Sequence, residues 1–154
     1  MKVPLQVLVL EDRPADAELV IKELDRAGFA VDWVRVDTIR DFRARLTPKL
    51  DLILSDYSLP GFTLVDAMAA VKGSGLGVPV ILVSGTIGDE RAAECLKLGV
   101  TDCILKDRMA RLGPAVHRAL LEREQRTTVE QSKELVARSE GQMRAMLSNL
   151  DDIV

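Results

Sequence analysis

Four short apolar segments of this sequence each lead into side chains that could take part in phosphoryl or metal chemistry. LQVLVL is followed by Glu11 and Asp12, DLILS by Asp56 and DCIL by Lys106, and VILVS ends in Ser84. Three carboxylates held close together repel one another, and a hard divalent cation such as Mg²⁺ relieves that repulsion. A carboxylate can also act as a nucleophile toward phosphorus. This set of side chains suits Mg²⁺-dependent transfer of a phosphoryl group onto an aspartate.

The elements that must bring these side chains together alternate along the chain. Short, nearly continuous apolar runs, typical of strands buried on both faces, predict strands at residues 5–10 and 51–55. The alternating segment 31–36, the run 80–84 and the short segment 102–105 are expected as the other three strands. Apolar residues at helical spacing lie between them and after the last one, with helices starting near Pro14, at 39, 64 and 90, and from 108 onward. This alternation predicts a parallel sheet with helices on both faces. Right-handed crossovers then place the carboxyl ends of the strands at one edge, where open α/β sheets carry their sites.

In this order, the strand-end residues resemble the CheY-like receiver domain of response regulators in two-component signalling. The residues that carry the resemblance are the pair Glu11-Asp12, Asp56, Ser84-Gly85 and Lys106, and it covers about residues 5–122. It implies an α/β, flavodoxin-like fold, a doubly wound parallel sheet of strand order 2-1-3-4-5 with an extended C-terminal helix. It also implies a signalling module that catalyses its own phosphorylation and dephosphorylation, and not a turnover enzyme on a metabolite.

The resemblance assigns the acidic residues to phosphoryl and metal binding. Asp56 would be the phosphoacceptor, and a histidine kinase or phosphotransfer protein would be the donor. Glu11, Asp12 and Asp56 would bind Mg²⁺, with the backbone carbonyl of Ser58 as a further ligand. Ser58 also argues against a phosphatase with an aspartyl intermediate, because such enzymes usually need a second aspartate at this position.

The resemblance gives other residues a role toward the phosphoryl group itself. Ser84 would donate a hydrogen bond to it, and Lys106 would pair with it. Thr86 is expected to line the mouth of the site and to influence the lifetime of the phosphoryl group or access of the kinase. Movement of Ser84 and Lys106 toward the added charge would shift a two-state equilibrium, which the C-terminal helix would transmit.

Two positions depart from the family pattern. The family often has Lys-Pro after the fifth strand, whereas this chain has Lys106-Asp107, so a cis-proline turn is not expected and Asp107 becomes a candidate N-cap. The family often has an aromatic switch residue three positions before the lysine, where this chain has Cys103. Cys103 is thus a candidate modulator. Because a small thiol cannot move in and out as a large ring does, the sequence does not indicate how the signal is relayed from this position. Because of these departures, an alternative function is also considered, in which the receiver fold docks partners and dimerises without being phosphorylated.

Beyond a receiver domain at residues 1–122, residues 123–154 are expected to form a helical linker. Apolar residues recur there at heptad spacing, in the row Val129, Val136, Met143 and Leu150. This spacing predicts a parallel coiled coil and a homodimer. Residues 139–154 resemble the entry to a PAS sensor domain, so the chain is interpreted as an N-terminal piece of a longer signalling protein such as a hybrid kinase.

The composition narrows the function classes further. The 154 residues include 21 Lys and Arg against 24 Asp and Glu, and a net charge of −3 argues against direct nucleic-acid binding through bulk positive charge. No apolar run approaches the roughly 18 residues of a membrane span, and the first residues lack a signal-peptide pattern, so a cytoplasmic location without direct membrane contact is expected. Cys95 and Cys103 lack metal-ligand spacing and are expected to be reduced.

Overall fold

The sheet that carries the predicted site has five parallel strands in the order β2-β1-β3-β4-β5. The computed structural model describes residues 2–56, 61, 63–85 and 89–126. The strands are β1 (Val3–Leu10), β2 (Phe29–Val36), β3 (Leu52–Ser55), β4 (Val80–Ser84) and β5 (Asp102–Leu105). The predicted flavodoxin-like α/β fold and its strand order are therefore confirmed.

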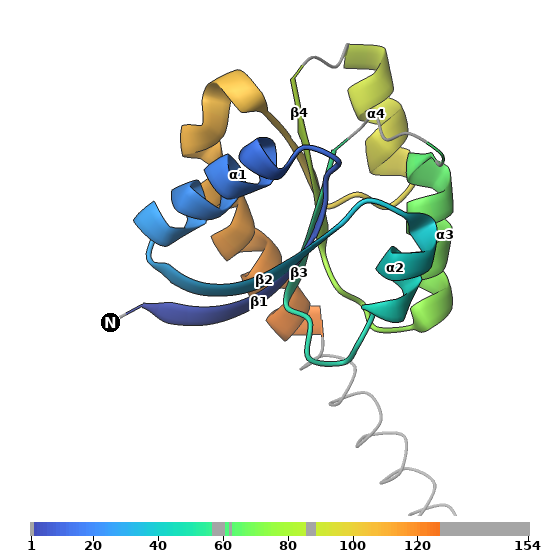
Figure 1. Ribbon diagram of the computed structural model, residues 1–154, viewed down its shortest axis with the longest axis horizontal. Coiled ribbons are helices and arrows are strands. Elements are labelled where there is room, and N and C mark those ends of the chain that lie inside the picture. Colours follow the sequence, from blue (N-terminus) through green and yellow to red (C-terminus); the bar gives the residue numbers. More distant parts are fainter. Residues whose placement is uncertain (1, 57–60, 62, 86–88, 127–154) are drawn as a thin grey trace, which may run out of the picture. The chain divides into compact units, whose positions relative to one another are not determined.

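Helices cover both faces of this sheet (Figure 1). They are α1 (Pro14–Arg26), α2 (Ile39–Ala44), α3 (Leu64–Ser74) and α4 (Asp89–Lys97). The 3-10 helix η1 (Lys106–Arg111) follows β5, and residues 112–126 are helical. We call residues 112–126 the last helix. The first apolar cluster joins the sheet to α1 and the last helix, and the second joins it to α2, α3 and α4.

The strands divide their side chains between these two clusters because successive side chains of a strand point to opposite faces. In β1, Val7 and Val9 belong to the first cluster, and Leu8 and Leu10 to the second. Every residue of β3 and β4 is buried. The apolar runs of β3 and β4 thus correspond to strands that are covered on both sides, whereas in β2 only Phe29 and Val36 are buried.

Local signals fix where the helices begin. α1 has Pro14 in its first turn, where a missing N–H is harmless and the fixed φ suits a helix. α3 begins with a capping box in which the Thr63 side chain accepts from the Asp66 N–H, and the Asp66 carboxylate accepts from the Thr63 N–H. Both signals thus mark the first turn of a helix in the sequence.

The chain after β5 differs from the sequence-based expectation. Asp107 is not the N-cap of a helix, because it lies inside η1, whose N-cap is Leu105 without a side-chain hydrogen bond. Arg108 has the non-helical angles φ −128° and ψ 45°, so the chain turns through η1 before the last helix starts. No cis peptide bond occurs among the described residues.

The last helix lies very close to the end of α1. A Cβ atom built on Gly113 would come within 2.7 Å of the Ala27 Cβ. Heavy atoms cannot approach that closely, so glycine at this position lets the two helices meet. This contact ties the chain after β5 to the element that follows β1.

The chain divides into two units, Met1–Leu120 and Leu121–Val154. In the second unit, the structure describes residues 121–126, which are helical. The predicted coiled-coil row and the PAS-like stretch lie outside the described residues. Within the described part of the chain, no helix combines the length and apolar character that a membrane crossing requires.

Candidate functional site

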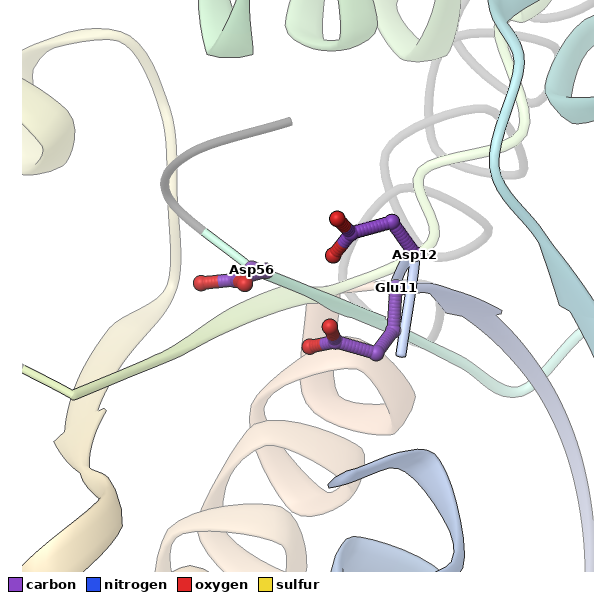
Figure 2. A group of neighbouring side chains, drawn as sticks. All are labelled: Glu11, Asp12 and Asp56. Carbon is purple, nitrogen blue, oxygen red and sulfur yellow. The ribbon is translucent and has the colours of Figure 1, made fainter. Parts of the chain in front are cut away.

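Three carboxylates gather at the carboxyl ends of β1 and β3. Glu11 and Asp12 follow β1 and Asp56 follows β3, and the side chains of Glu11 and Asp12 extend toward the side on which Asp56 lies (Figure 2). One carboxylate oxygen from each residue lies within 4.8 Å of the others. Strands far apart in the sequence thus bring together the acidic residues that the sequence singled out.

Backbone hydrogen bonds of the sheet continue one residue past the strands and hold this cluster. The Glu11 N–H donates to the Val36 carbonyl over 3.1 Å, and the Asp56 N–H donates to the Leu10 carbonyl over 2.9 Å. The Arg35 guanidinium, on β2, donates to the Glu11 carbonyl at 3.1 Å. Because the backbone is fixed on both sides, the acidic side chains start from rigid positions.

Glu11 is the most enclosed of the three, with an exposed fraction of 5%. Its carboxylate borders a small cavity lined mostly by apolar side chains from β1, α1, β3 and β4. Burial raises the pKa of Glu11 to about 7, helped by Asp12 and by the charge of Asp56. The Arg13 N–H, which donates to Glu11 at 3.0 Å, and the Lys106 ammonium act in the opposite direction without cancelling the effect.

The donor set fits a hard divalent cation. All three side chains offer carboxylate oxygens, which are the ligands that Mg²⁺ prefers. A bound cation would neutralise these neighbouring charges and relieve their mutual repulsion. Glu11, Asp12 and Asp56 are therefore the residues that would hold the metal. The Ser58 carbonyl, the fourth predicted ligand, lies outside the described residues.

Lys106, the first residue after β5, brings a positive charge to the same edge. Its ammonium lies 3.6 Å from the Glu11 carboxylate and 3.8 Å from that of Asp56. The closest partner is Asp16, which accepts a hydrogen bond from Lys106 at 3.0 Å. Burial works to lower the pKa of Lys106, but the hydrogen bond to Asp16 and the three surrounding acidic charges outweigh it and raise that pKa.

Asp16, which lies outside the three-carboxylate cluster but pairs with Lys106, is a residue that the sequence analysis missed. An acidic residue in the first turn of a helix is commonly explained by the helix dipole alone, and nothing local links it to a lysine 90 positions later. A signal was nevertheless present. Because Pro14 starts α1 directly after the edge-forming Glu11 and Asp12, the first helical turn has to lie beside the same edge.

Ser84 and the residues around it complete the predicted set. Ser84 is buried at the end of β4 and pairs in the strand register with Leu105, the residue that directly precedes Lys106. Thr86 lies outside the described residues. The structure thus places Ser84 at the expected edge, and the roles of Ser84, Lys106 and Thr86 toward a phosphoryl group stay predictions.

Cys103 occupies the position, three residues before Lys106, at which the receiver family often has an aromatic switch residue. Its half-buried side chain packs against the second apolar cluster, to which the buried Cys95 of α4 belongs. Burial raises the pKa of both thiols. Both cysteines are free, as the sequence predicted, and Cys103 has the surroundings of a packed apolar residue.

Comparisons with known proteins agree with this geometry. The family model of the response regulator receiver domain matches residues 7–117. The transcriptional regulatory protein CusR of Escherichia coli is 28% identical over 102 residues, which are 66% of this chain and 44% of that protein. The two-component response regulator ORR6 of rice, Oryza sativa subsp. japonica, is 28% identical over 106 residues, covering 66% of this chain and 62% of that protein. The chain thus spans about half the length of these relatives.

Solved structures share the fold. A response regulator receiver domain protein from Clostridium thermocellum superposes with a TM-score of 0.66 at 18% identity, covering 78% of this chain and 97% of that one. The phosphorylated cyanobacterial phytochrome response regulator RcpA superposes with a TM-score of 0.59 at 23% identity, covering 74% and 89%.

Proposed function

The chain belongs to the family of response regulator receiver domains, and from this premise we propose that it accepts a phosphoryl group on Asp56 in two-component signalling. A histidine kinase or a phosphotransfer protein would be the donor. The observation that carries the proposal is the meeting of Glu11, Asp12, Asp56 and Lys106 at one sheet edge. A structural role alone would not require three carboxylates to be held together at such an electrostatic cost.

The reaction needs a nucleophile, a leaving group and compensation for negative charge. An Asp56 carboxylate oxygen forms a bond to phosphorus while the bond from phosphorus to the donor imidazole nitrogen breaks. The imidazole leaves with the electron pair and takes up a proton from solvent. Lys106, 3.8 Å from the Asp56 carboxylate, is placed to pair with the transferred group, and Ser84 would donate a hydrogen bond to it.

Mg²⁺, when bound by Glu11, Asp12 and Asp56, would neutralise charge on these carboxylates and on the phosphoryl oxygens. The chain's own contribution is the rigid backbone under those residues and the enclosure of Glu11. The receiver is a signalling module whose output would pass through the last helix into residues 123–154. Because the chain spans about half of its curated relatives, we propose that any effector activity belongs to other segments or partners.

The first experiment measures the intact mass of the full chain after incubation with acetyl phosphate, a small acyl-phosphate donor, and Mg²⁺. We expect a gain of one phosphoryl group that disappears with Asp56→Asn and when the metal is chelated. The matched control is Asp51→Asn, which removes a carboxylate next to the opposite end of β3, where it accepts from the Gln6 N–H. This variant should still gain the group.

Three results would point elsewhere. A gain that survives Asp56→Asn would mean that another side chain is the acceptor. No gain in the wild-type chain, together with no binding of beryllofluoride, would favour the unphosphorylated docking and dimerisation module. Sustained hydrolysis of a generic phosphate ester such as p-nitrophenyl phosphate would favour a phosphatase.

A further inference from the structure

Lys106 is surrounded by carboxylates from three elements, and only one of them is within hydrogen-bonding distance. Asp16 of α1 lies 3.0 Å from the Lys106 ammonium, whereas Glu11 and Asp56 lie at 3.6 and 3.8 Å. The partner that Lys106 prefers in this state is thus a residue outside the acidic cluster that would hold the metal.

The position of Asp16 favours a firm ion pair. It lies in the first turn of the 13-residue helix α1, where the helix dipole stabilises a negative side chain. The side chains of Asp16 and Lys106 are only 25% and 27% exposed, so solvent and salt screen this pair less than an ion pair on the open surface. The pair also joins α1 to the chain that follows β5.

We propose that Asp16 is a positioning residue, which holds Lys106 in the unphosphorylated chain and competes for it with the phosphoryl group. This inference rests on the proposed function of Asp56. Phosphorylation replaces the single negative charge of the Asp56 carboxylate, which lies 3.8 Å from the ammonium, by a phosphoryl group that carries nearly two negative charges and three acceptor oxygens. Lys106 then turns from Asp16 to these oxygens, and the first turn of α1 loses its tie to the chain after β5.

The competition has a measurable consequence. Each binding event at the phosphoryl site has to break the contact between Lys106 and Asp16, so this contact weakens the binding. Without the Asp16 charge, a phosphoryl mimic should bind about two- to fivefold more tightly, which corresponds to the measured range for partly exposed ion pairs. The acidic residue therefore sets how readily the receiver switches.

The test measures the affinity of the full chain for beryllofluoride, a non-covalent mimic of the phosphoryl group, by isothermal titration in the presence of Mg²⁺. Asp16→Asn keeps the size of the side chain and removes its charge, and we expect the two- to fivefold tighter binding. Asp16→Glu restores the charge and should bring the affinity back toward wild type. Glu18→Gln removes an exposed charge from the same helix and should leave the affinity unchanged.

A second background separates the ion pair from a general effect of charge. In Lys106→Gln, there is no ammonium for Asp16 to hold, so adding Asp16→Asn should change the affinity by less than in the wild-type chain. An equal gain in both backgrounds would overturn the proposal, because the effect would then be long-range repulsion of the anion. Unchanged or weaker binding by Asp16→Asn in the wild-type background would overturn it as well.

A third readout does not depend on phosphoryl chemistry. The NMR signal of the Lys106 ammonium nitrogen, recorded without beryllofluoride, should shift in Asp16→Asn and stay in place in Glu18→Gln. An unshifted signal in Asp16→Asn would show that the pair does not form. If the signal shifts but the wild-type chain binds no beryllofluoride, the ion pair stands, and both the proposed function and the release of Lys106 fail.

Discussion

Glu11 is the only carboxyl group that the described part of the chain buries. In the folded chain its pKa is raised from 4.5 to about 7, with burial as the largest cause. Between these two pH values the folded chain keeps a proton that the unfolded chain has lost. Glu11 therefore contributes stability that is complete below pH 4.5 and is lost as the pH rises through 7.

This behaviour predicts how the metal-free chain responds to pH. We expect the free energy of unfolding of the wild-type chain, relative to that of Glu11→Gln, to fall by about 1–3 kcal/mol between pH 4.5 and pH 8. Glu11→Gln serves as the reference because it cannot titrate, so the difference isolates this one group. Urea unfolding in a chelating buffer at several pH values measures it. A difference that stays constant over this range would contradict the raised pKa.

At the scale of elements, the sequence predicts the buried strands more accurately than the turns between the elements. Residues 80–84 and 102–105 were predicted as strands with the observed bounds. The first is an apolar run that is buried throughout, whereas only Ile104 of the second is buried. The turn through η1 was missed, since no side-chain hydrogen bond caps its start and the non-helical angles of Arg108 follow no local sequence signal. The prediction that Asp107 is an N-cap was wrong for the same reason, because Asp107 lies inside this turn. Asp16 was missed for a related reason, as its partner is defined only by the assembled sheet.

The close contact between α1 and the last helix leads to a prediction at the same scale. Gly113→Ala should destabilise the chain by about 1–2 kcal/mol, because its Cβ would meet the Ala27 Cβ at 2.7 Å. Gly73→Ala in α3 is the matched control, as its Cβ would enter open space and alanine favours a helix by up to about 1 kcal/mol. Urea unfolding monitored by circular dichroism gives both values.

A rescue variant makes this prediction specific. Adding Ala27→Gly to Gly113→Ala removes the clashing methyl group, so the double variant should lose less stability than the sum of the two single changes. Additive losses would mean that the two positions do not touch. Gly113→Ala with wild-type stability would contradict the contact itself.

At the scale of the whole molecule, the sequence of residues 123–154 leads to a prediction about self-association. The heptad row in this segment predicts a dimer. Met143→Lys places a charge in that row, and we expect it to raise the dissociation constant of the full-length dimer at least tenfold by sedimentation equilibrium. Gln142→Lys, which adds the same charge one position outside the row, should have little effect. Equal effects of the two variants, or a wild-type chain that is monomeric at all concentrations, would contradict the coiled coil.

The pairing of Asp16 with a lysine 90 positions later has a consequence for a chain that is still being made. Synthesis proceeds from the N-terminus, so the three acidic residues of the cluster leave the ribosome well before β5 and Lys106. A nascent chain that ends before β5 has these carboxylates without the Lys106 ammonium, which in the finished fold lies 3.6 Å from Glu11 and 3.8 Å from Asp56. The charge balance of this sheet edge is therefore complete only after the last strand and Lys106 have been added.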